Sequence, residues 1–180
     1  MKAILELGFS VNVPFKMCKM VRWILPLQGL MLNVDGASKG NPGPCGDGGL
    51  FKNPHGTVSL AFSHFYGLGY VRWWLLAIKQ GLMITEIWSD PLSLVNPLHT
   101  GVAPSWDYYR WWRDVHDFVQ QHGVRVSHVY REANQVADAL ANYACLMHCN
   151  EVFNSSRQLP RPCFPSLIGD RMGLRSFRSP

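Results

Sequence analysis

The chain has 180 residues, of which 47% are hydrophobic and 16% are charged. That hydrophobic content excludes a chain that is disordered throughout, and the length is enough for one domain with a sizeable core and short tails. No uninterrupted apolar run reaches the roughly 18 residues of a membrane-spanning helix, so we expect no membrane partner.

The formal net charge of +5 is unevenly distributed along the chain. Residues 1–29 and 151–180 are basic, whereas residues 30–150 carry nearly equal numbers of acidic and basic side chains. Basic ends of this kind can contact a polyanion, although short basic tails also act simply as solubilising ends.

The cysteines do not form a recognisable metal or disulfide pattern. Five are present without any C-x-x-C pair, and Cys145, Cys149 and His148 together supply too few ligands for a zinc site. We therefore expect free thiols in a reducing, intracellular location, either nuclear or cytoplasmic.

The first part of the chain is expected to form an antiparallel meander after an irregular basic lead-in over residues 1–29. Apolar and polar residues alternate with the two-residue period of a strand, and the turn formers of Asn53–Gly56 separate two such runs. The predicted strands are Leu30–Gly36, Gly46–Lys52 and Thr57–Phe65.

Beyond Gly69 the hydrophobic pattern changes mainly to the helical period. The predicted elements are a helix over Tyr70–Met83, a strand over Ile84–Ser89, a helix over Pro91–Asn96, a loop over Pro97–Trp106, a helix over Asp107–Gln121, a strand over Val124–Tyr130 and a helix over Gln135–His148 capped by Asn134. Residues 149–180 are rich in proline and arginine, so we expect a disordered tail. The element order predicts an α/β domain over residues 30–148, in which helices flank a five-stranded mixed sheet of three antiparallel strands followed by parallel ones.

Three aspartates stand at the ends of these predicted elements. Asp35 lies late in the first strand, Asp90 follows the fourth strand, and Asp138 lies in the first turn of the last helix. Each could be a turn former or a helix-capping charge when it is considered alone. Three carboxylates in one site would repel one another unless divalent cations neutralised them, and oxygen-only ligands suit Mg²⁺.

A glycine-rich loop follows the first of these aspartates. Gly40–Gly43 prevents further regular structure and supplies backbone N–H groups next to Lys39. This combination suits a metal ion and a phosphate better than it suits a hydrophobic core.

Two long motifs and one short one carry a resemblance to a known family. They are Leu32–Gly43, Ser89–Asp90 and His128–Ala141, in that order along the chain. On these motifs residues 22–146 resemble the type 1 ribonuclease H-like domain, in the form found in plant retroelement (non-LTR) reverse transcriptases and their single-domain relatives. The resemblance implies a ribonuclease H-like fold and Mg²⁺-dependent endonucleolytic hydrolysis of the RNA strand of an RNA–DNA hybrid, with Mn²⁺ as a possible substitute.

The resemblance also assigns roles to individual residues. Asp35 would bridge two metal ions, Asp138 would complete the site that prepares the attacking water, and Asp90 would complete the site on the leaving-group side. The nucleic acid would meet Lys39, Gly40, Asn41 and Gly43, with Asn41 near a ribose 2′-hydroxyl, the group that distinguishes RNA from DNA.

The chain departs from the family at the acidic residue of the first helix. The register of Ala77–Leu82 puts Trp74 where the family has a glutamate, and no acidic residue lies between Asp47 and Glu86. A tryptophan cannot bind Mg²⁺, so the two-metal site is expected to be incomplete and the activity impaired. The strand and junction around residues 83–89 are also about two residues shorter than in the family, a change that preserves which face each side chain occupies.

Two interpretations of function remain. One is a hydrolase of RNA–DNA hybrids with reduced activity, and the other is an inactive nucleic-acid-binding or decayed retroelement-derived relative. We expect a monomer in either case. His128 is expected to be structural because it lies on a strand, and Glu132 is a weaker candidate for the site.

Overall fold

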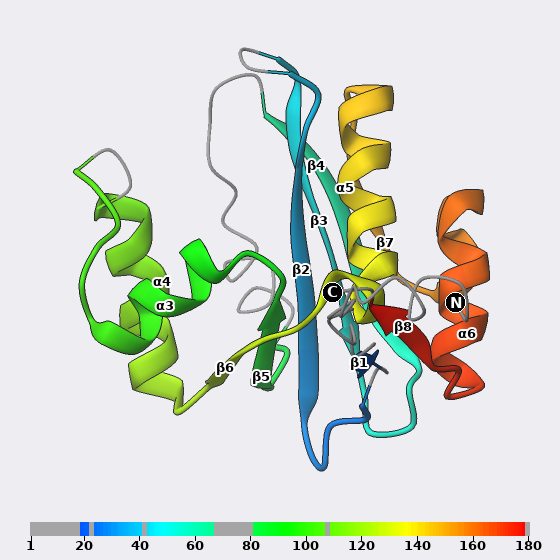
Figure 1. Ribbon diagram of the computed structural model, residues 1–180, viewed down its shortest axis with the longest axis horizontal. Coiled ribbons are helices and arrows are strands. Elements are labelled where there is room, and N and C mark those ends of the chain that lie inside the picture. The colour runs from blue at the N-terminus through cyan, green and yellow to red at the C-terminus, as the bar shows by residue number, and fades with distance from the viewer. Residues whose placement is uncertain (1–18, 22–23, 41–42, 67–80, 107–108, 179–180) are drawn as a thin grey trace, which may run out of the picture.

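A mixed sheet of six strands forms the centre of the computed structural model, which describes residues 19–21, 24–40, 43–66, 81–106 and 109–178 (Figure 1). The strand order is β6-β5-β2-β3-β4-β7. The sequence predicts five strands, and the sixth is β7 (Asn150–Phe153), which pairs antiparallel with β4. The α/β class and the mixed sheet are confirmed.

The predicted meander is present; its first two strands are slightly longer than predicted, and the third is shifted by one residue. It consists of β2 (Leu30–Ser38), β3 (Cys45–Lys52) and β4 (Val58–Tyr66), joined in antiparallel register. Gly48 in β3 is required by packing, because a Cβ at this position would lie 2.3 Å from the backbone nitrogen of Ala141 in the helix above it.

The second half of the sheet is parallel. β5 (Ile84–Ser89) pairs with β2, and β6 (Arg125–His128) pairs with β5. The predicted helix over Tyr70–Met83 lies almost entirely outside the described residues, and so does Trp74.

Two helices connect the parallel strands, α3 (Leu92–Thr100) and α4 (Tyr109–His122). The prediction of a helix over Pro91–Asn96 followed by a loop from Pro97 is wrong at this boundary, because α3 continues through Pro97 to Thr100, where a left-handed Gly101 caps it. The carbonyl of Pro97 accepts hydrogen bonds from Gly101 N at 3.1 Å and from Trp112 Nε1 in α4 at 3.1 Å. These bonds satisfy the Pro97 carbonyl and join the end of α3 to α4.

Each face of the sheet has its own hydrophobic core. On one face Leu32 and Phe51 pack with residues of α3 and α4, such as Val95 and Val115. On the other face Leu50 and Ala61 pack with α5 (Gln135–Met147) and α6 (Phe164–Arg171). Figure 1 shows the two pairs of helices on opposite sides of the sheet. None of the helices in the described part of the chain reaches the length and hydropathy that crossing a membrane requires.

The junction that leads into α5 differs from the prediction in one detail. A short 3-10 turn, η1 (Arg131–Ala133), precedes Asn134. Asn134 stands at the N-cap position of α5 but makes no side-chain capping bond. Its buried amide donates to the Val34 carbonyl at 2.9 Å and accepts from Asn33 Nδ2 at 3.2 Å, so it fastens the start of α5 to β2.

The segment after residue 149 is ordered where a disordered tail is expected. Beyond β7 it forms η2 (Ser156–Gln158), η3 (Arg161–Cys163), α6 and β8 (Ser176–Arg178), which pairs with β1 (Lys19–Val21). Leu159, Cys163 and Leu167 are buried in the same hydrophobic core as α5, and this burial explains why the segment is structured. Pro162 and Pro165 lie in the first turns of η3 and α6, and Pro160 is the N-cap of η3, positions where the missing N–H costs little.

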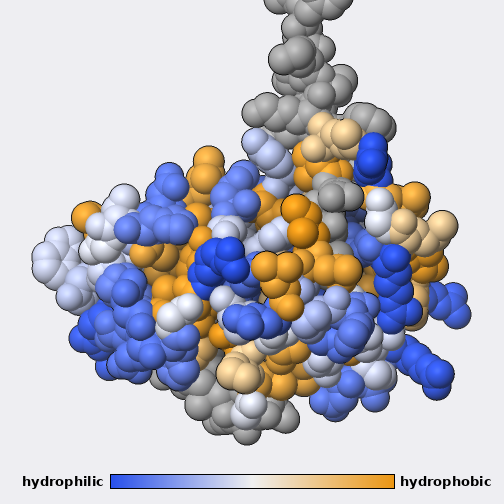
Figure 2. Space-filling model, turned by 90° about the horizontal axis from the view of Figure 1, so that it is seen from below, coloured by the Kyte–Doolittle hydropathy of each residue, from blue (hydrophilic) through white to orange (hydrophobic). Residues whose placement is uncertain are grey.

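Seen from below, the molecule combines apolar and hydrophilic surface, with apolar side chains gathered near the middle of this end (Figure 2). Exposed large apolar side chains of the described residues include Leu27, Met83, Met172 and Leu174.

Candidate active site

Asp35 occupies a half-enclosed position late in β2. Its side chain is mostly buried, and its Oδ1 accepts a hydrogen bond from Gly36 N at 2.8 Å. The pKa of Asp35 is raised to about 6, chiefly by burial and also by the charges of Asp138 and Asp90, against the lowering effects of the Gly36 hydrogen bond and Arg131. The Asp35 carboxyl therefore lies within electrostatic range of both other predicted aspartates.

Asp90 reaches this neighbourhood because β5 runs parallel to β2. Val34 pairs with Ser89, so Asp35 and Asp90 are the next residues on two adjacent strands. His128 at the end of β6 brings its Nε2 to 3.9 Å from Asp90 Oδ1. His128, which the sequence predicts to be structural, therefore lies beside one of the three aspartates.

Asp138 approaches from the helix on the other side of the sheet. Its N–H bonds to the carbonyl of Asn134 at 3.1 Å, within the first turn of α5. Its carboxylate forms an ion pair with Arg131, whose side chain is 66% exposed. Because Asn134 fastens this turn to Val34, the neighbour of Asp35, Asp138 is brought to the same end of the sheet.

The donor set suits a hard divalent cation, but the site is not pre-assembled. All three side chains offer only oxygen, as Mg²⁺ prefers. A bound cation would stabilise the ionised form of Asp35 against the burial and repulsion that raise its pKa. Within the described ranges, no three His, Cys, Asp or Glu side chains are already grouped closely enough to hold a metal ion. Two of the three carboxylates instead face cationic or titratable neighbours, Arg131 and His128.

The glycine-rich loop is attached to α5 near Asp138. Lys39 Nζ donates to Asn142 Oδ1, and Asn142 Nδ2 donates to the Asp138 carbonyl at 2.8 Å. A Cβ on Gly43 would lie 2.2 Å from the Lys39 carbonyl oxygen, so only glycine fits there. Gly40 has a positive φ of 106°, another conformation that favours glycine. Asn41 lies outside the described residues.

A cavity of about 550 Å³ adjoins Asp35 and contains an acid that the sequence analysis did not identify as functional. Asp47 and Tyr66 line it together with Asp35 and Trp111. Burial raises the pKa of Asp47 to about 8, although a hydrogen bond with Tyr66 lowers it. Oδ1 of Asp47 is buried and has no hydrogen-bond partner among the described residues. The only sequence signal for it was a charged residue inside the glycine-rich strand Gly46–Gly49.

Arg131 is the second residue that the sequence analysis did not single out. It lies one position before Glu132, the weaker candidate, whose Oε2 is buried without a hydrogen-bond partner among the described residues. The sequence placed an arginine seven positions before Asp138, but only the 3-10 turn between them brings the two side chains together.

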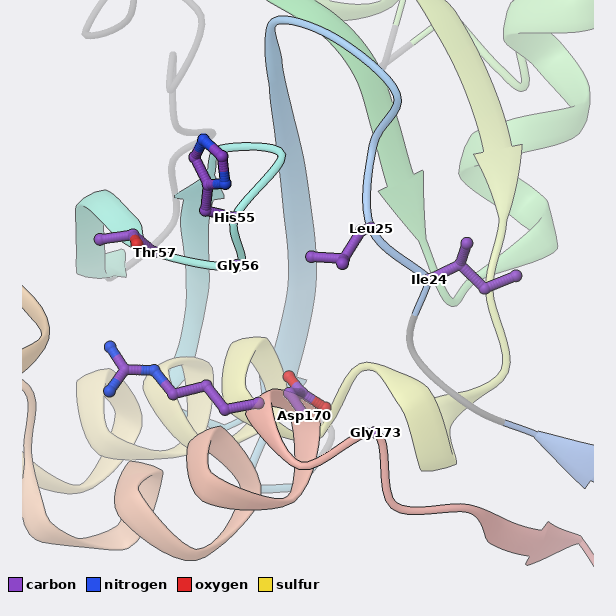
Figure 3. A pocket seen from close by; sticks show the side chains of 8 residues that line it. Ile24, Leu25, His55, Gly56, Thr57, Asp170 and Gly173 are labelled. Carbon is purple, nitrogen blue, oxygen red and sulfur yellow. The ribbon is translucent and has the colours of Figure 1, made fainter.

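A larger cavity of about 730 Å³ lies at the opposite end of β2. Its lining comes from the segment before β2, the turn between β3 and β4, and the end of α6 (Figure 3). Figure 3 shows Leu25 and Asp170 pointing toward the turn that carries His55. Asp170 Oδ2 lies 2.6 Å from the buried Nζ of Lys52, so this acid is already paired and does not form a second cluster of carboxylates.

Comparisons with known proteins agree with the fold. A family described as reverse transcriptase-like matches residues 75–144. An Arabidopsis thaliana protein with a provisional ribonuclease H name is 35% identical over 143 residues, which make up 70% of this chain and 22% of that protein. This chain thus spans about a fifth of the length of that relative.

Solved structures show the same architecture at lower identity. Ribonuclease H1 from Halobacterium salinarum is 23% identical, with a TM-score of 0.55 over 67% of this chain and 98% of that one. LC11 ribonuclease H1, isolated from compost and solved in complex with an RNA/DNA hybrid, is 20% identical, with a TM-score of 0.55 over 66% of this chain and 98% of that one. Together with the mixed sheet, these likenesses show that the chain has a ribonuclease H-like fold.

Proposed function

We propose that this chain binds RNA–DNA hybrids and hydrolyses their RNA strand slowly, with a divalent cation held by Asp35, Asp90 and Asp138. The observation that carries the proposal is the mutual electrostatic influence of these three carboxylates, which come from two adjacent strands and a helix. The ribonuclease H1 solved with a hybrid bound supports the substrate class, because it shares the fold.

A bound divalent cation would supply charge neutralisation at the scissile phosphate and activation of a water molecule. The chain contributes the scaffold for this chemistry. Asp35 is held by Gly36 N, Asp138 by the turn that Asn134 fastens to β2, and Asp90 by the end of β5. These supports fix the backbone around each carboxylate before any ligand arrives.

The nucleic-acid backbone would meet the loop of Lys39–Gly43. Lys39 is held by Asn142, which is itself bonded to the carbonyl of Asp138, so one chain of hydrogen bonds connects the loop to the cation site. A hybrid seated on this loop would therefore have its phosphate backbone next to the carboxylates. Lys39, Gly40, Asn41 and Gly43 form the proposed contact.

Slow turnover is part of the proposal because of Trp74. By resemblance this position carries a fourth acidic ligand, and tryptophan offers no oxygen to a cation. Losing about 4 kcal/mol of transition-state stabilisation lowers a rate by roughly a thousandfold.

The experiment measures cleavage of an end-labelled RNA–DNA hybrid by the full chain in Mg²⁺ and in Mn²⁺, with duplex DNA and duplex RNA as control substrates. Weak, metal-dependent cleavage of the RNA strand that disappears in Asp35→Asn supports the proposal. Trp74→Glu should raise the rate by at least tenfold. Equal cleavage by wild type and Asp35→Asn would contradict the proposed site.

A second candidate function is hybrid binding without turnover. It is favoured by the absence of a pre-assembled metal group among the described residues and by Trp74. Hybrid binding that persists in Asp35→Asn, with no cleavage by wild type or Trp74→Glu in either metal, would support this alternative over the first.

A further inference from the structure

Arg131 lies on the short turn that precedes α5 and reaches back to the acid in the first turn of that helix. Its Nη2 contacts Asp138 Oδ1 in a charge-assisted hydrogen bond. The bond joins a guanidinium to one of the three carboxylates that the proposed function assigns to a divalent cation. In the described chain, therefore, Asp138 already has a positive partner.

The influence of Arg131 extends beyond Asp138. The hydrogen bond and charge of Asp138 raise the pKa of the Arg131 guanidinium, and the charges of Asp35 and Asp90 raise it further, against the lowering effect of burial. In return, the positive charge of Arg131 lowers the pKa of Asp35. Arg131 is thus within electrostatic range of all three carboxylates, as a cation in that site would be.

We propose that Arg131 is a resident counter-cation of the three-carboxylate site, bound to Asp138 in the free chain and displaced from it when a divalent cation binds. This inference rests on the proposed function, since it treats the three acids as one cation site. It adds that cation affinity is set by competition with a side chain of the protein itself.

The structure allows this exchange because the side chain and its backbone are held differently. The Arg131 side chain is 66% exposed, so it can move into solvent without opening the core. The turn that carries it is anchored by the buried Ala133 and Asn134, which do not need to move. Exposed ion pairs are weak enough for a divalent cation to replace them.

Arg125 provides a control that matches Arg131 in charge and in side-chain exposure. Arg125 forms an ion pair with Glu86 at 2.7 Å, and its side chain is also 66% exposed. This pair contains none of the three aspartates. Arg125→Gln therefore removes the same charge and the same kind of contact from outside the site.

The experiment measures Mn²⁺ binding to the full chain without nucleic acid, by the electron paramagnetic resonance signal of free Mn²⁺ at pH 7.5 and low ionic strength. Arg131→Gln should bind about tenfold more tightly than wild type, a change of about 1.4 kcal/mol. Arg131→Lys, which keeps the charge, should stay within about threefold of wild type. Arg125→Gln should be indistinguishable from wild type, and circular dichroism confirms that each variant folds.

The possible outcomes separate this inference from the proposed function. If Arg131→Gln binds as wild type does or more weakly, while Asp35→Asn abolishes binding, the cation site stands and the role of Arg131 is overturned. If Asp35→Asn binds Mn²⁺ as well as wild type, the cation site itself is contradicted, and the inference about Arg131 is overturned with it.

Discussion

An aspartate is paired with a basic residue near each end of β2, but the two pairs are built differently. At one end, Lys52 and Asp170 meet at 2.6 Å with side-chain exposures of 2% and 18%. At the other end, Arg131 and Asp138 pair with exposures of 66% and 26%. The first pair joins the sheet to α6, whereas the second lies beside the candidate cation site.

This difference indicates which pair can be exchanged for a ligand. Two buried charges depend on each other, since removing one leaves the other without compensation in a medium of low dielectric constant. Two exposed charges can return to water at little cost. The buried pair is therefore suited to holding α6 in place, and the exposed pair is suited to release.

The largest expected effect comes from breaking the buried pair. Lys52→Met leaves the carboxylate of Asp170 largely buried and unpaired, and it should lower the free energy of unfolding by about 3 kcal/mol at pH 7. Urea denaturation followed by circular dichroism measures this loss. The double variant Lys52→Met, Asp170→Leu should recover most of the stability, because it removes both charges. A Lys52→Met protein as stable as wild type would show that the pair is not structural.

The second effect concerns the pH dependence that Asp35 creates at the other end. Its pKa is about 6 in the folded chain and 3.8 in the unfolded chain, so between these values the folded chain holds a proton that the unfolded chain has released. The contribution of Asp35 therefore makes the protein less stable as the pH rises from about 4 to about 6. Allowing for partial exposure, this loss should be about 2 kcal/mol above pH 7.

Asp35→Asn removes that titration and serves as the comparison. In metal-free buffer the variant should be about 2 kcal/mol more stable than wild type at pH 7.5 and equal to it near pH 4. Urea denaturation across this pH range measures the difference in the free energy of unfolding between the two proteins. The contribution of Asp47 to the pH dependence cancels, because both proteins contain it. A constant difference between the two proteins at all pH values would contradict the raised pKa of Asp35.

The fold was predicted from the sequence where local pattern and tertiary structure agree. The strand Ile84–Ser89 is predicted with the correct bounds because β-branched and aromatic residues form a short run that Asp90-Pro91 ends. α3 was predicted too short, since proline usually ends a helix. The hydrogen bond from Trp112 to the Pro97 carbonyl depends on how α4 packs, which no local pattern reveals.

The C-terminal segment and Asn134 show the same limit. The proline and arginine content predicts disorder after residue 149. Leu159 and Leu167 are nevertheless buried in the core between α5 and the sheet, which forms only when the chain has folded. Asn134 has the sequence position of a helix cap, yet its amide bonds to residues 100 and 101 positions earlier.

Part of the candidate site could be predicted from the sequence for similar reasons. Asp35 lies late in β2, Asp90 directly follows β5 and Asp138 lies in the first turn of α5, so their convergence follows from the topology once the strand order is known. Asp47 and Arg131 carry no such signal. Their importance comes from a cavity wall and a 3-10 turn, which depend on side-chain placement.

The third prediction concerns the buried hydrogen bonds of Asn134, which join α5 to β2 at the end of the molecule that holds the candidate site. Asn134→Ala removes two buried hydrogen bonds between α5 and β2, and it should lower the free energy of unfolding by about 1.5 kcal/mol. Asn142→Ala removes two hydrogen bonds of a half-buried side chain on the same helix, so it is the matched control and should cost less, about 0.5 kcal/mol. Chemical denaturation compares the two, and equal losses would show that Asn134 is not a special anchor.

The smallest expected effect on stability belongs to the exposed pair. Arg131→Gln should change the free energy of unfolding in metal-free buffer by less than about 1 kcal/mol, because both side chains of the pair return to water. Arg125→Gln should cost more than Arg131→Gln, because its partner Glu86 is only 11% exposed and cannot return to water as Asp138 can. If Arg131→Gln instead destabilises the chain by as much as Lys52→Met does, then Arg131 is part of the framework, and its release by a divalent cation would be too costly to occur. A small loss of stability combined with tighter Mn²⁺ binding is the result expected of a side chain that can be exchanged for a ligand.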